Sequence, residues 1–135
     1  MEPSDGRVFR GHLARGTDFP PYLIVRAADR AVIGSAGTSA PDPHGGVVLG
    51  YGVYPQHEGS GYATEAATVL CRARLADERV KAVRATIPIG HTASEKVATD
   101  AGLSATDQEV EEDGTRLRCW QLSRDQDPAA AESSR

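Results

Sequence analysis

The pattern of apolar and polar residues changes period several times along the 135-residue chain. Short runs rich in β-branched residues predict strands, whereas apolar residues at spacings of three and four predict helices. Together these patterns predict the order β-β-β-α-β-α-β-β in a mixed α/β sheet. The expected elements are strands at 21–26, 31–37 and 47–55, a helix at 61–77, a strand at 80–90, a helix at 92–101, and two strands within 109–122.

The first expected helix carries a face of small apolar residues, which lets a helix lie close against a sheet. That face consists of Ala63, Ala66, Ala67, Leu70, Ala73 and Ala76. In the strand that follows, apolar residues alternate with others from Val83 to Ile89, as in a half-buried strand. The strand–helix–strand unit over 47–90 should therefore be a right-handed parallel crossover.

Three residues inside the expected strands interrupt the pattern. Gly50 and Gly52 mark either a bulge or a close approach of another group to the backbone. Pro88 has no N–H to donate to a ladder, so one side of its strand should be unpaired near the end.

Turn and capping signals set several boundaries. Thr92 and Glu95 have the spacing of a capping box for the second helix, and Gly102 is suited to end that helix. The Asp113-Gly114 pair is the strongest hairpin signal in the chain. Ala27–Arg30 predicts a tight connection between the first two strands.

Composition narrows the classes of function. The length predicts one domain, and a net charge of −4 argues against a nucleic-acid partner. No apolar run approaches the ~18 residues of a membrane span, and the first residues do not resemble a signal peptide. Cys71 and Cys119 are far apart and lie in no Cys/His cluster, so we expect no metal site, no disulfide and a cytoplasmic location.

The chain divides into three segments in this interpretation. Residues 1–19 form a short N-terminal segment that is poorly structured or makes one helical turn. Residues 20–123 form the folded domain. Residues 124–135 have no apolar period and are expected to be a disordered tail.

The stretch from Val47 to Ala67 has the order of a strand, a glycine-containing loop and a helix N-terminus. The first N–H groups of a helix lack intrahelical acceptors, and the helix dipole adds partial positive charge there. Gly59 and Gly61 lack a Cβ, so a phosphate could approach their backbone closely. No lysine follows the glycines, which excludes a P-loop, and the spacing fits the Rossmann fingerprint poorly.

The segment Gln56–Ala63, QHEGSGYA, matches the pattern Q/R-x-x-G-x-G/A, and the chain resembles the GNAT N-acetyltransferases over roughly 20–123. Residues 91–103 resemble a second family segment, N-x-A-S-x-x-V-x-x-x-x-G-F. The branch that acetylates ribosomal-protein N-termini is the most similar in pattern. The resemblance implies an α/β (α+β) fold with a mixed, mostly antiparallel sheet, a central splayed pair of parallel strands, and packed helices.

The resemblance also implies chemistry. Acetyl-CoA would be the acyl donor, and a primary amine, either a protein N-terminus or a small molecule, would attack its thioester directly. The CoA pyrophosphate would lie on the N–H groups of Gln56 through Tyr62, and the pantetheine arm beside the backbone of Val53 and Tyr54. The cofactor-binding candidates are Val53, Tyr54, Gln56, His57, Glu58, Gly59, Ser60, Gly61, Tyr62, Ala63, His91 and Ser94.

Two of these residues are also catalytic candidates. Ser94 would stand near the sulfur and protonate the leaving thiolate, directly or through water. His91 replaces the asparagine that commonly holds the pantetheine arm, and it could also be an ordinary surface histidine before a helix. Tyr51 and Tyr54 are alternative acids, although tyrosines in a strand more often pack.

Further departures from the family pattern leave alternatives open. Glu58 and Ser60 stand where the loop usually carries a basic residue, and Val48 stands where a glutamate is often the candidate base. The region before the first strand is short. Either a partner subunit, for example in a homodimer, closes the acceptor side, or the acceptor site is open, or the chain has lost acetyl transfer. The alternatives are a non-catalytic acyl-CoA-binding module and a structural dimerising domain.

Overall fold

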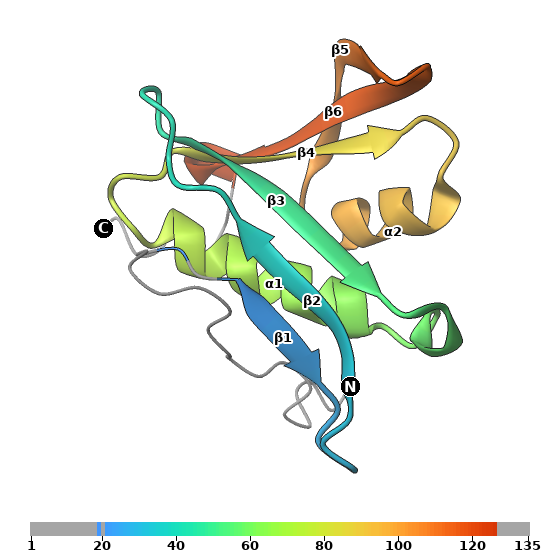
Figure 1. Ribbon diagram of the computed structural model, residues 1–135. Helices are drawn as coiled ribbons and strands as arrows, with labels where there is room; N and C mark the ends of the chain where they lie inside the picture. Colours follow the sequence, from blue (N-terminus) through green and yellow to red (C-terminus); the bar gives the residue numbers. More distant parts are fainter. Residues whose placement is uncertain (1–18, 20, 127–135) are drawn as a thin grey trace.

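The computed structural model describes residue 19 and residues 21–126 as one six-stranded sheet with two α-helices (Figure 1). The strand order is β1-β2-β3-β4-β6-β5, and only β3 and β4 are parallel. The expected mixed, mostly antiparallel sheet with one central parallel pair is therefore confirmed. The strands are β1 (Tyr22–Val25), β2 (Val32–Thr38), β3 (Gly46–Val53), β4 (Ala82–Pro88), β5 (Ser104–Glu112) and β6 (Thr115–Ser123).

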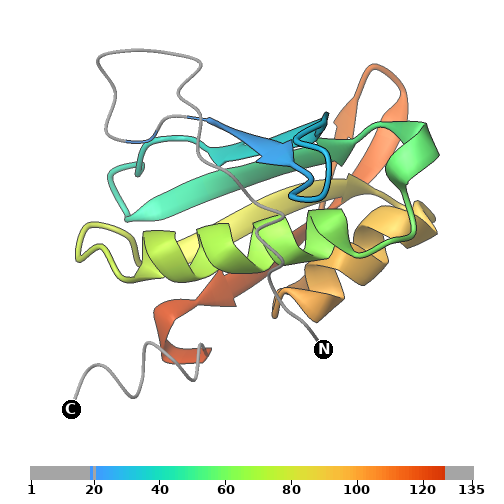
Figure 2. The ribbon, with the colours of Figure 1, turned by 90° about the horizontal axis from the view of Figure 1, so that it is seen from below.

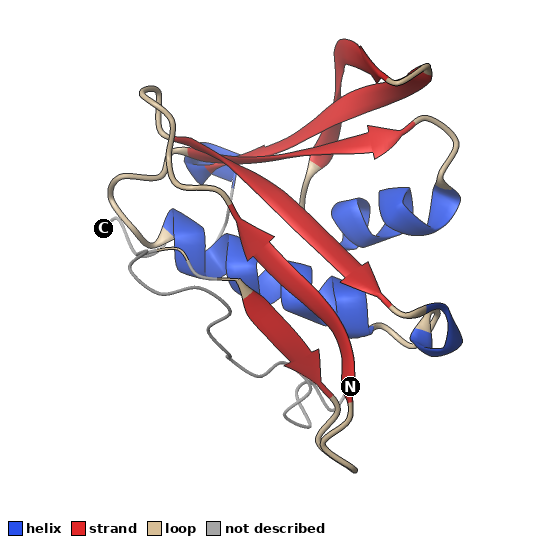
Figure 3. Cartoon of the chain, viewed as in Figure 1, coloured by secondary structure: helices blue, strands red, loops and turns tan. Residues whose placement is uncertain are grey.

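Both α-helices lie on the same face of the sheet, as the view from below shows (Figure 2). Helix α1 (Tyr62–Leu75) packs against β2, β3 and β4, and α2 (Thr92–Asp100) packs against α1 and β4. Apolar residues of the strands alternate in exposure, so Val47 and Leu49 are buried under α1 while Val48 is 54% exposed. The opposite face of β2 and β3 carries no described helix (Figure 3).

The buried face of α1 differs in part from the expected one. Ala66, Ala67 and Leu70 are buried as expected, but Ala73 and Ala76 are exposed. The buried residues of the last turns are instead Cys71, Arg74 and Leu75. A 3.6-residue period moves the inward stripe around the helix, so a spacing of three continued from Leu70 leaves the core.

Arg74 is a buried cation that no sequence pattern indicated. Its side chain is 6% exposed, and its Nε donates to the Thr38 hydroxyl at 2.6 Å. The guanidinium lies over the ring of Phe19, 5.1 Å from the centroid. Phe19, which we assigned to the N-terminal segment, is thus part of the core. The helical turn expected before it lies outside the described residues.

The cap of α2 lies one residue earlier than the sequence predicted. His91, not Thr92, is the N-cap, because its Nδ1 accepts the Ser94 N–H at 3.2 Å. Glu95 still reaches back, but it accepts from the N–H of Gly90. Gly102, with φ of 104°, ends the helix as expected.

The two hairpins form where the turn signals lie. Asp113 and Gly114 both have positive φ and join β5 to β6, although β5 begins earlier than expected, at Ser104. The β1–β2 turn is closed by a hydrogen bond from the N–H of Arg26 to the oxygen of Ala31.

The disordered tail was expected to begin at residue 124, and this boundary is wrong. Arg124–Gln126 form a 3-10 helix, η2, and the Arg124 side chain donates to the carbonyls of Asp77 and Val80. The rest of the expected tail, 127–135, lies outside the described residues.

Gly50 and Gly52 mark no bulge, because the register between β2 and β3 is unbroken from Gly34 to Thr38. The close approach involves another glycine. A Cβ added to Gly34 would lie 2.2 Å from the oxygen of Gly52, whereas a Cβ on Gly50 or Gly52 would meet no described atom within 4 Å. These two glycines therefore leave the sheet surface uncovered by the described part of the chain.

Candidate functional site

The parallel strands β3 and β4 separate along their length. They pair only from Gly46 to Val48 and from Ala82 to Arg84, after which each strand continues without the other (Figure 1). Strand β4 stays paired with β6 as far as Pro88. The sheet thus has a gap between β3 and β4 at their C-terminal ends, as the splayed pair predicted.

Backbone alternation decides which groups of β3 face this gap. Tyr54 donates its N–H to the oxygen of Ile33, and the oxygen of Val48 accepts from Ser39, so even-numbered residues point toward β2. The N–H and C=O groups of Tyr51 and Val53 therefore point toward the gap. The expected role of Val53 fits this geometry, but that of Tyr54 does not, because its N–H is held by β2 and its oxygen accepts from His57.

Pro88, at the end of β4, lies on the side of the gap opposite β3. Its neighbour Ile89 donates its N–H to the oxygen of Arg116 on the β6 side. Successive residues point to opposite sides of a strand, so the nitrogen of Pro88 faces β3. The missing donor thus faces the gap, which agrees with the predicted unpaired side.

In the loop after β3, fewer backbone N–H groups are available than the sequence predicted. Pro55–His57 form a 3-10 turn, η1, in which the N–H groups of His57 and Glu58 donate to Tyr54 and Pro55. These two N–H groups are therefore not available, contrary to the predicted row from Gln56 to Tyr62. The N–H groups of the next three residues, Gly59, Ser60 and Gly61, have no hydrogen-bond acceptor within the described part of the chain.

The glycines of this loop adopt the left-handed conformation that the row of donors needs. Gly59 and Gly61 have φ of 85° and 86°, and Gly61 is the N-cap of α1. A Cβ on either would meet nothing within 4 Å among residue 19 and residues 21–126, so these residues leave the space outside the loop open. The structure therefore brings exposed N–H groups and a helix N-terminus to the mouth of the gap.

His91 and Ser94 are brought together beside the gap, at the start of α2. The Nδ1 atom of His91 accepts from the Ser94 N–H, which leaves Nε2–H as the donor of a neutral ring. The Ser94 side chain is half-buried, and its hydroxyl makes no hydrogen bond within the described residues. Ser94 can thus donate a proton without breaking a native contact.

Tyr51 connects β3 to the same turn of α2. Its phenol donates to the backbone oxygen of Ser94 at 3.0 Å. Burial raises the pKa of Tyr51, so the phenol stays protonated at neutral pH. As an alternative acid, Tyr51 would have to release this contact, and its most direct role is to hold Ser94 against the gap.

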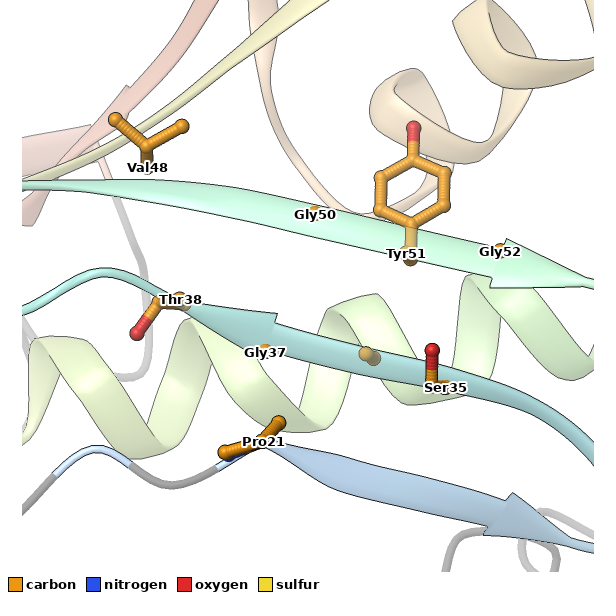
Figure 4. A pocket seen from close by; sticks show the side chains of 9 residues that line it. Pro21, Ser35, Gly37, Thr38, Val48, Gly50, Tyr51 and Gly52 are labelled. Carbon is orange, nitrogen blue, oxygen red and sulfur yellow. The ribbon is translucent and has the colours of Figure 1, made fainter. Parts of the chain in front are cut away.

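A pocket of about 580 Å³ lies on the sheet face opposite α1 (Figure 4). Its floor is the backbone of β2 and β3 at Gly37, Gly50 and Gly52, and Val48 stands at one end. The remaining lining residues are Pro21, Ser35, Ala36, Thr38 and Tyr51. The described lining is uncharged, so it holds no carboxylate that could act as a base.

Arg26 reaches the loop from a distant segment, and no sequence signal indicated it. Its Nη1 lies 3.5 Å from Nδ1 of His57 in η1. Asp29 holds the guanidinium through two hydrogen bonds, of 3.0 and 2.7 Å, and these bonds lower the pKa of Asp29 to about 2. The pKa of Arg26 is raised, first by Asp29 and then by a hydrogen bond with Tyr62.

The described residues contain no group of three or more His, Cys, Asp or Glu side chains arranged to hold a metal ion. None of their helices is long and apolar enough to cross a membrane. Cys71 is buried among apolar residues and packs as a small hydrophobe, whereas Cys119 is only half-buried.

Comparison with known proteins gives a family match. The model of the family described as "Acetyltransferase (GNAT) domain" matches residues 6–104. No sequence among curated proteins matches the chain.

Several solved structures share the fold. A GNAT-family acetyltransferase from Bacillus anthracis has a TM-score of 0.68 at 14% identity, covering 76% of this chain and 65% of that one. The ribosomal-protein-S5-alanine acetyltransferase from Vibrio fischeri has a TM-score of 0.71 at 16% identity, covering 82% and 64%. The spermidine N-acetyltransferase from Vibrio cholerae, in complex with CoA and spermine, has a TM-score of 0.69 at 11% identity, covering 80% and 67%. The chain thus spans 64–67% of the length of these structures.

Proposed function

Since the chain belongs to the GNAT acetyltransferase family, we propose that it transfers an acetyl group from acetyl-CoA to a primary amine. One observation carries the proposal. The gap between β3 and β4 leads to a loop whose Gly59–Gly61 N–H groups face open space. The spermidine N-acetyltransferase from Vibrio cholerae, solved in complex with CoA and spermine, supports the same chemistry.

The described residues fit acetyl-CoA in two respects. The N–H groups of Gly59, Ser60 and Gly61, with the N-terminus of α1, suit the pyrophosphate. The gap-facing N–H and C=O groups of Tyr51 and Val53 suit the amides of the pantetheine arm. His91 offers Nε2–H from the other side of the gap.

Acetyl-CoA supplies an activated acyl group whose carbonyl carbon the amine attacks, with the CoA thiolate as leaving group. Ser94 provides the proton for this thiolate, because its hydroxyl makes no hydrogen bond within the described residues and its backbone is fixed by His91 and Tyr51. The attacking nitrogen gives up its extra proton to solvent, and Ser94 regains a proton from solvent. Val48 occupies the position of the usual carboxylate base, so solvent removes the proton from the ammonium form of the acceptor.

The acceptor amine approaches, in this proposal, over the pocket floored by Gly37, Gly50 and Gly52. The floor lacks side chains, so the substrate can lie directly on the β2–β3 backbone. The uncharged lining favours an acceptor whose amine is its main polar group, and either a protein N-terminus or a small amine meets that condition.

A second candidate is a non-catalytic acyl-CoA-binding module of the same fold. The uncharged pocket with Val48 at its end favours it, because a base within the site normally assists the attack. The two candidates share the cofactor site and differ only in turnover.

Titration with CoA and acetyl-CoA, followed by an amine panel, separates these candidates. We expect calorimetric heat of binding with both ligands and an acetylated product from at least one amine or peptide N-terminus. Binding without any product across the panel would favour the non-catalytic module. No heat at millimolar ligand would contradict both.

A further inference from the structure

The pyrophosphate loop of this chain has no basic side chain of its own. Within Pro55–Ala63 the ionisable residues are Glu58, His57 and Tyr62, and none is Lys or Arg. A pyrophosphate carries at least two negative charges, and a nearby carboxylate opposes its binding. Backbone N–H groups and a helix dipole of about half a charge neutralise only part of that charge.

Arg26 is the cationic side chain that contacts this loop in the described part of the chain. It follows β1 directly and reaches across to η1, where its Nη1 approaches His57 at 3.5 Å. It also forms a hydrogen bond with Tyr62, the first residue of α1. The guanidinium therefore borders both ends of the loop that presents Gly59–Gly61.

The guanidinium of Arg26 is held in place and keeps donors to spare. Asp29 takes the Nε–H and one Nη2–H, His57 faces one Nη1–H, and Tyr62 shares a further bond. A guanidinium has five N–H donors, so at least one remains for a phosphate oxygen. The side chain is 32% exposed, so this donor can be reached from outside.

We propose that Arg26 binds the pyrophosphate of CoA and replaces, from the β1–β2 hairpin, the basic side chain that the loop lacks. The proposal rests on the proposed function. It assigns cofactor affinity to a residue that is 31 positions from His57 in sequence and in a different element. Arg26 is a binding residue in this role and takes no part in the acyl transfer step.

The competing role for Arg26 is mechanical, because the same contacts could simply fasten η1 to the hairpin. If Arg26 only fastens η1, its substitution would disturb the end of β3 and weaken the binding of every thioester alike. If Arg26 binds phosphate, its substitution would weaken the binding of only those ligands that carry the pyrophosphate. S-acetylpantetheine, which has the thioester and amides but no phosphate, separates the two.

The test compares Arg26→Gln with wild type by calorimetry and by initial rates, using acetyl-CoA and S-acetylpantetheine. We expect the Kd and KM for acetyl-CoA to rise about tenfold or more, as for loss of a charge-assisted hydrogen bond, with kcat little changed. The constants for S-acetylpantetheine should stay within about twofold. Arg26→Lys keeps the charge but not the forked set of N–H donors. Its Kd and KM for acetyl-CoA should therefore lie between those of wild type and those of Arg26→Gln.

Arg79→Gln is the matched control. Arg79 makes the same two hydrogen bonds to Asp77, at 3.0 and 2.7 Å, but at the far end of α1. Arg79→Gln should change the Kd and KM of neither acetyl-CoA nor S-acetylpantetheine. Equal losses for both thioesters in Arg26→Gln, or no loss for acetyl-CoA, would overturn the proposal. If wild type binds no CoA at all, the proposed function fails first and this inference fails with it.

A second measurement, which compares wild type with Arg26→Lys, applies even if Arg26→Gln does not fold. Inorganic pyrophosphate should compete with acetyl-CoA, and its inhibition should weaken in Arg26→Lys. Unchanged inhibition in a folded Arg26→Lys protein would count against the proposal.

Discussion

The two ends of the β3–β4 pair use glycine for opposite reasons. At the closed end, Gly45 and Gly46 lie where another chain segment already fills the space, since added Cβ atoms would come within 2.8 Å of Lys81 and 2.7 Å of Arg84. At the open end, an added Cβ at Gly59 or Gly61 would have no atom of the described residues within 4 Å. Glycine thus allows close packing where the strands meet and exposes the backbone where they part.

The polar contacts differ between the ends in the same way. The carbonyl of Gly45 accepts from the N–H groups of Lys81 and Ala82, and Arg84 pairs with Asp42 at 3.5 Å. At the open end, the native contacts of Tyr51 and His91 hold one residue, Ser94, and its hydroxyl makes no hydrogen bond to the part of the chain that the structure describes. The closed end holds the strands together, and the open end keeps its polar groups available.

Gly61→Glu should produce the largest effect, because it places a carboxylate at the open end where the pyrophosphate is proposed to lie. Two charges about 5 Å apart at an effective dielectric constant near 20 repel by about 3 kcal/mol. We therefore expect the affinity for CoA, measured by calorimetry, to fall more than a hundredfold.

Gly114→Glu is the control for this charge. Gly114 has φ of 83°, close to the 86° of Gly61, and its added Cβ also meets no described atom within 4 Å. Both variants carry the same backbone strain, of order 1–3 kcal/mol, but only one faces the cofactor. If both lost CoA equally, the effect would come from stability and the proposed site would be wrong.

Ser94→Ala should have the next largest effect, and on turnover. The substitution removes the hydroxyl but leaves the backbone hydrogen bonds to His91 and Tyr51 intact. Loss of a general acid typically lowers kcat by about a hundredfold, and we expect the Kd for CoA to change little. Thr92→Ala, two residues earlier on the same turn, should leave kcat unchanged. A change in affinity without a change in kcat would assign Ser94 to binding instead.

Gly45→Ala and Gly52→Ala compare the two ends by stability alone. Gly45 has φ of 85° and a crowded Cβ position, so its substitution should cost about 1–3 kcal/mol of unfolding free energy. Gly52→Ala adds a methyl group to an open surface and should change stability by about 0.5 kcal/mol or less. Chemical denaturation of both variants measures the difference. Equal costs would mean that the open end is packed in solution.

Local patterns predicted much of the fold because they act over a few residues. The alternation from Val83 to Ile87, the Asp113-Gly114 turn and the αL residue Gly102 all appear where the sequence places them. The errors lie where side-chain geometry decides between close alternatives. The N-cap moved from Thr92 to His91 because an imidazole nitrogen could reach the Ser94 N–H, and the inward stripe of α1 rotated onto Arg74 and Leu75.

The features of the candidate site also divide into those that local sequence patterns predicted and those that they did not. The loop glycines and Ser94 were readable, because glycine at the αL position and a serine in the first turn of a helix are local features. The sequence did not show which backbone N–H groups of the loop stay free, since the 3-10 turn uses the N–H groups of His57 and Glu58. The engagement of the Tyr54 backbone was equally hidden, because it depends on the register of β2 against β3.

The sequence by itself determined the order of strands and helices, the family, and the strand–loop–helix unit from Val47 to Ala67, because these depend on periodicity and on residues adjacent in the chain. Only the tertiary structure decided what surrounds that unit. It brought Tyr51 to Ser94, 43 residues apart, and Arg26 to His57, 31 residues apart. Such contacts depend on how the sheet and helices pack, and no local pattern encodes which distant side chains will meet.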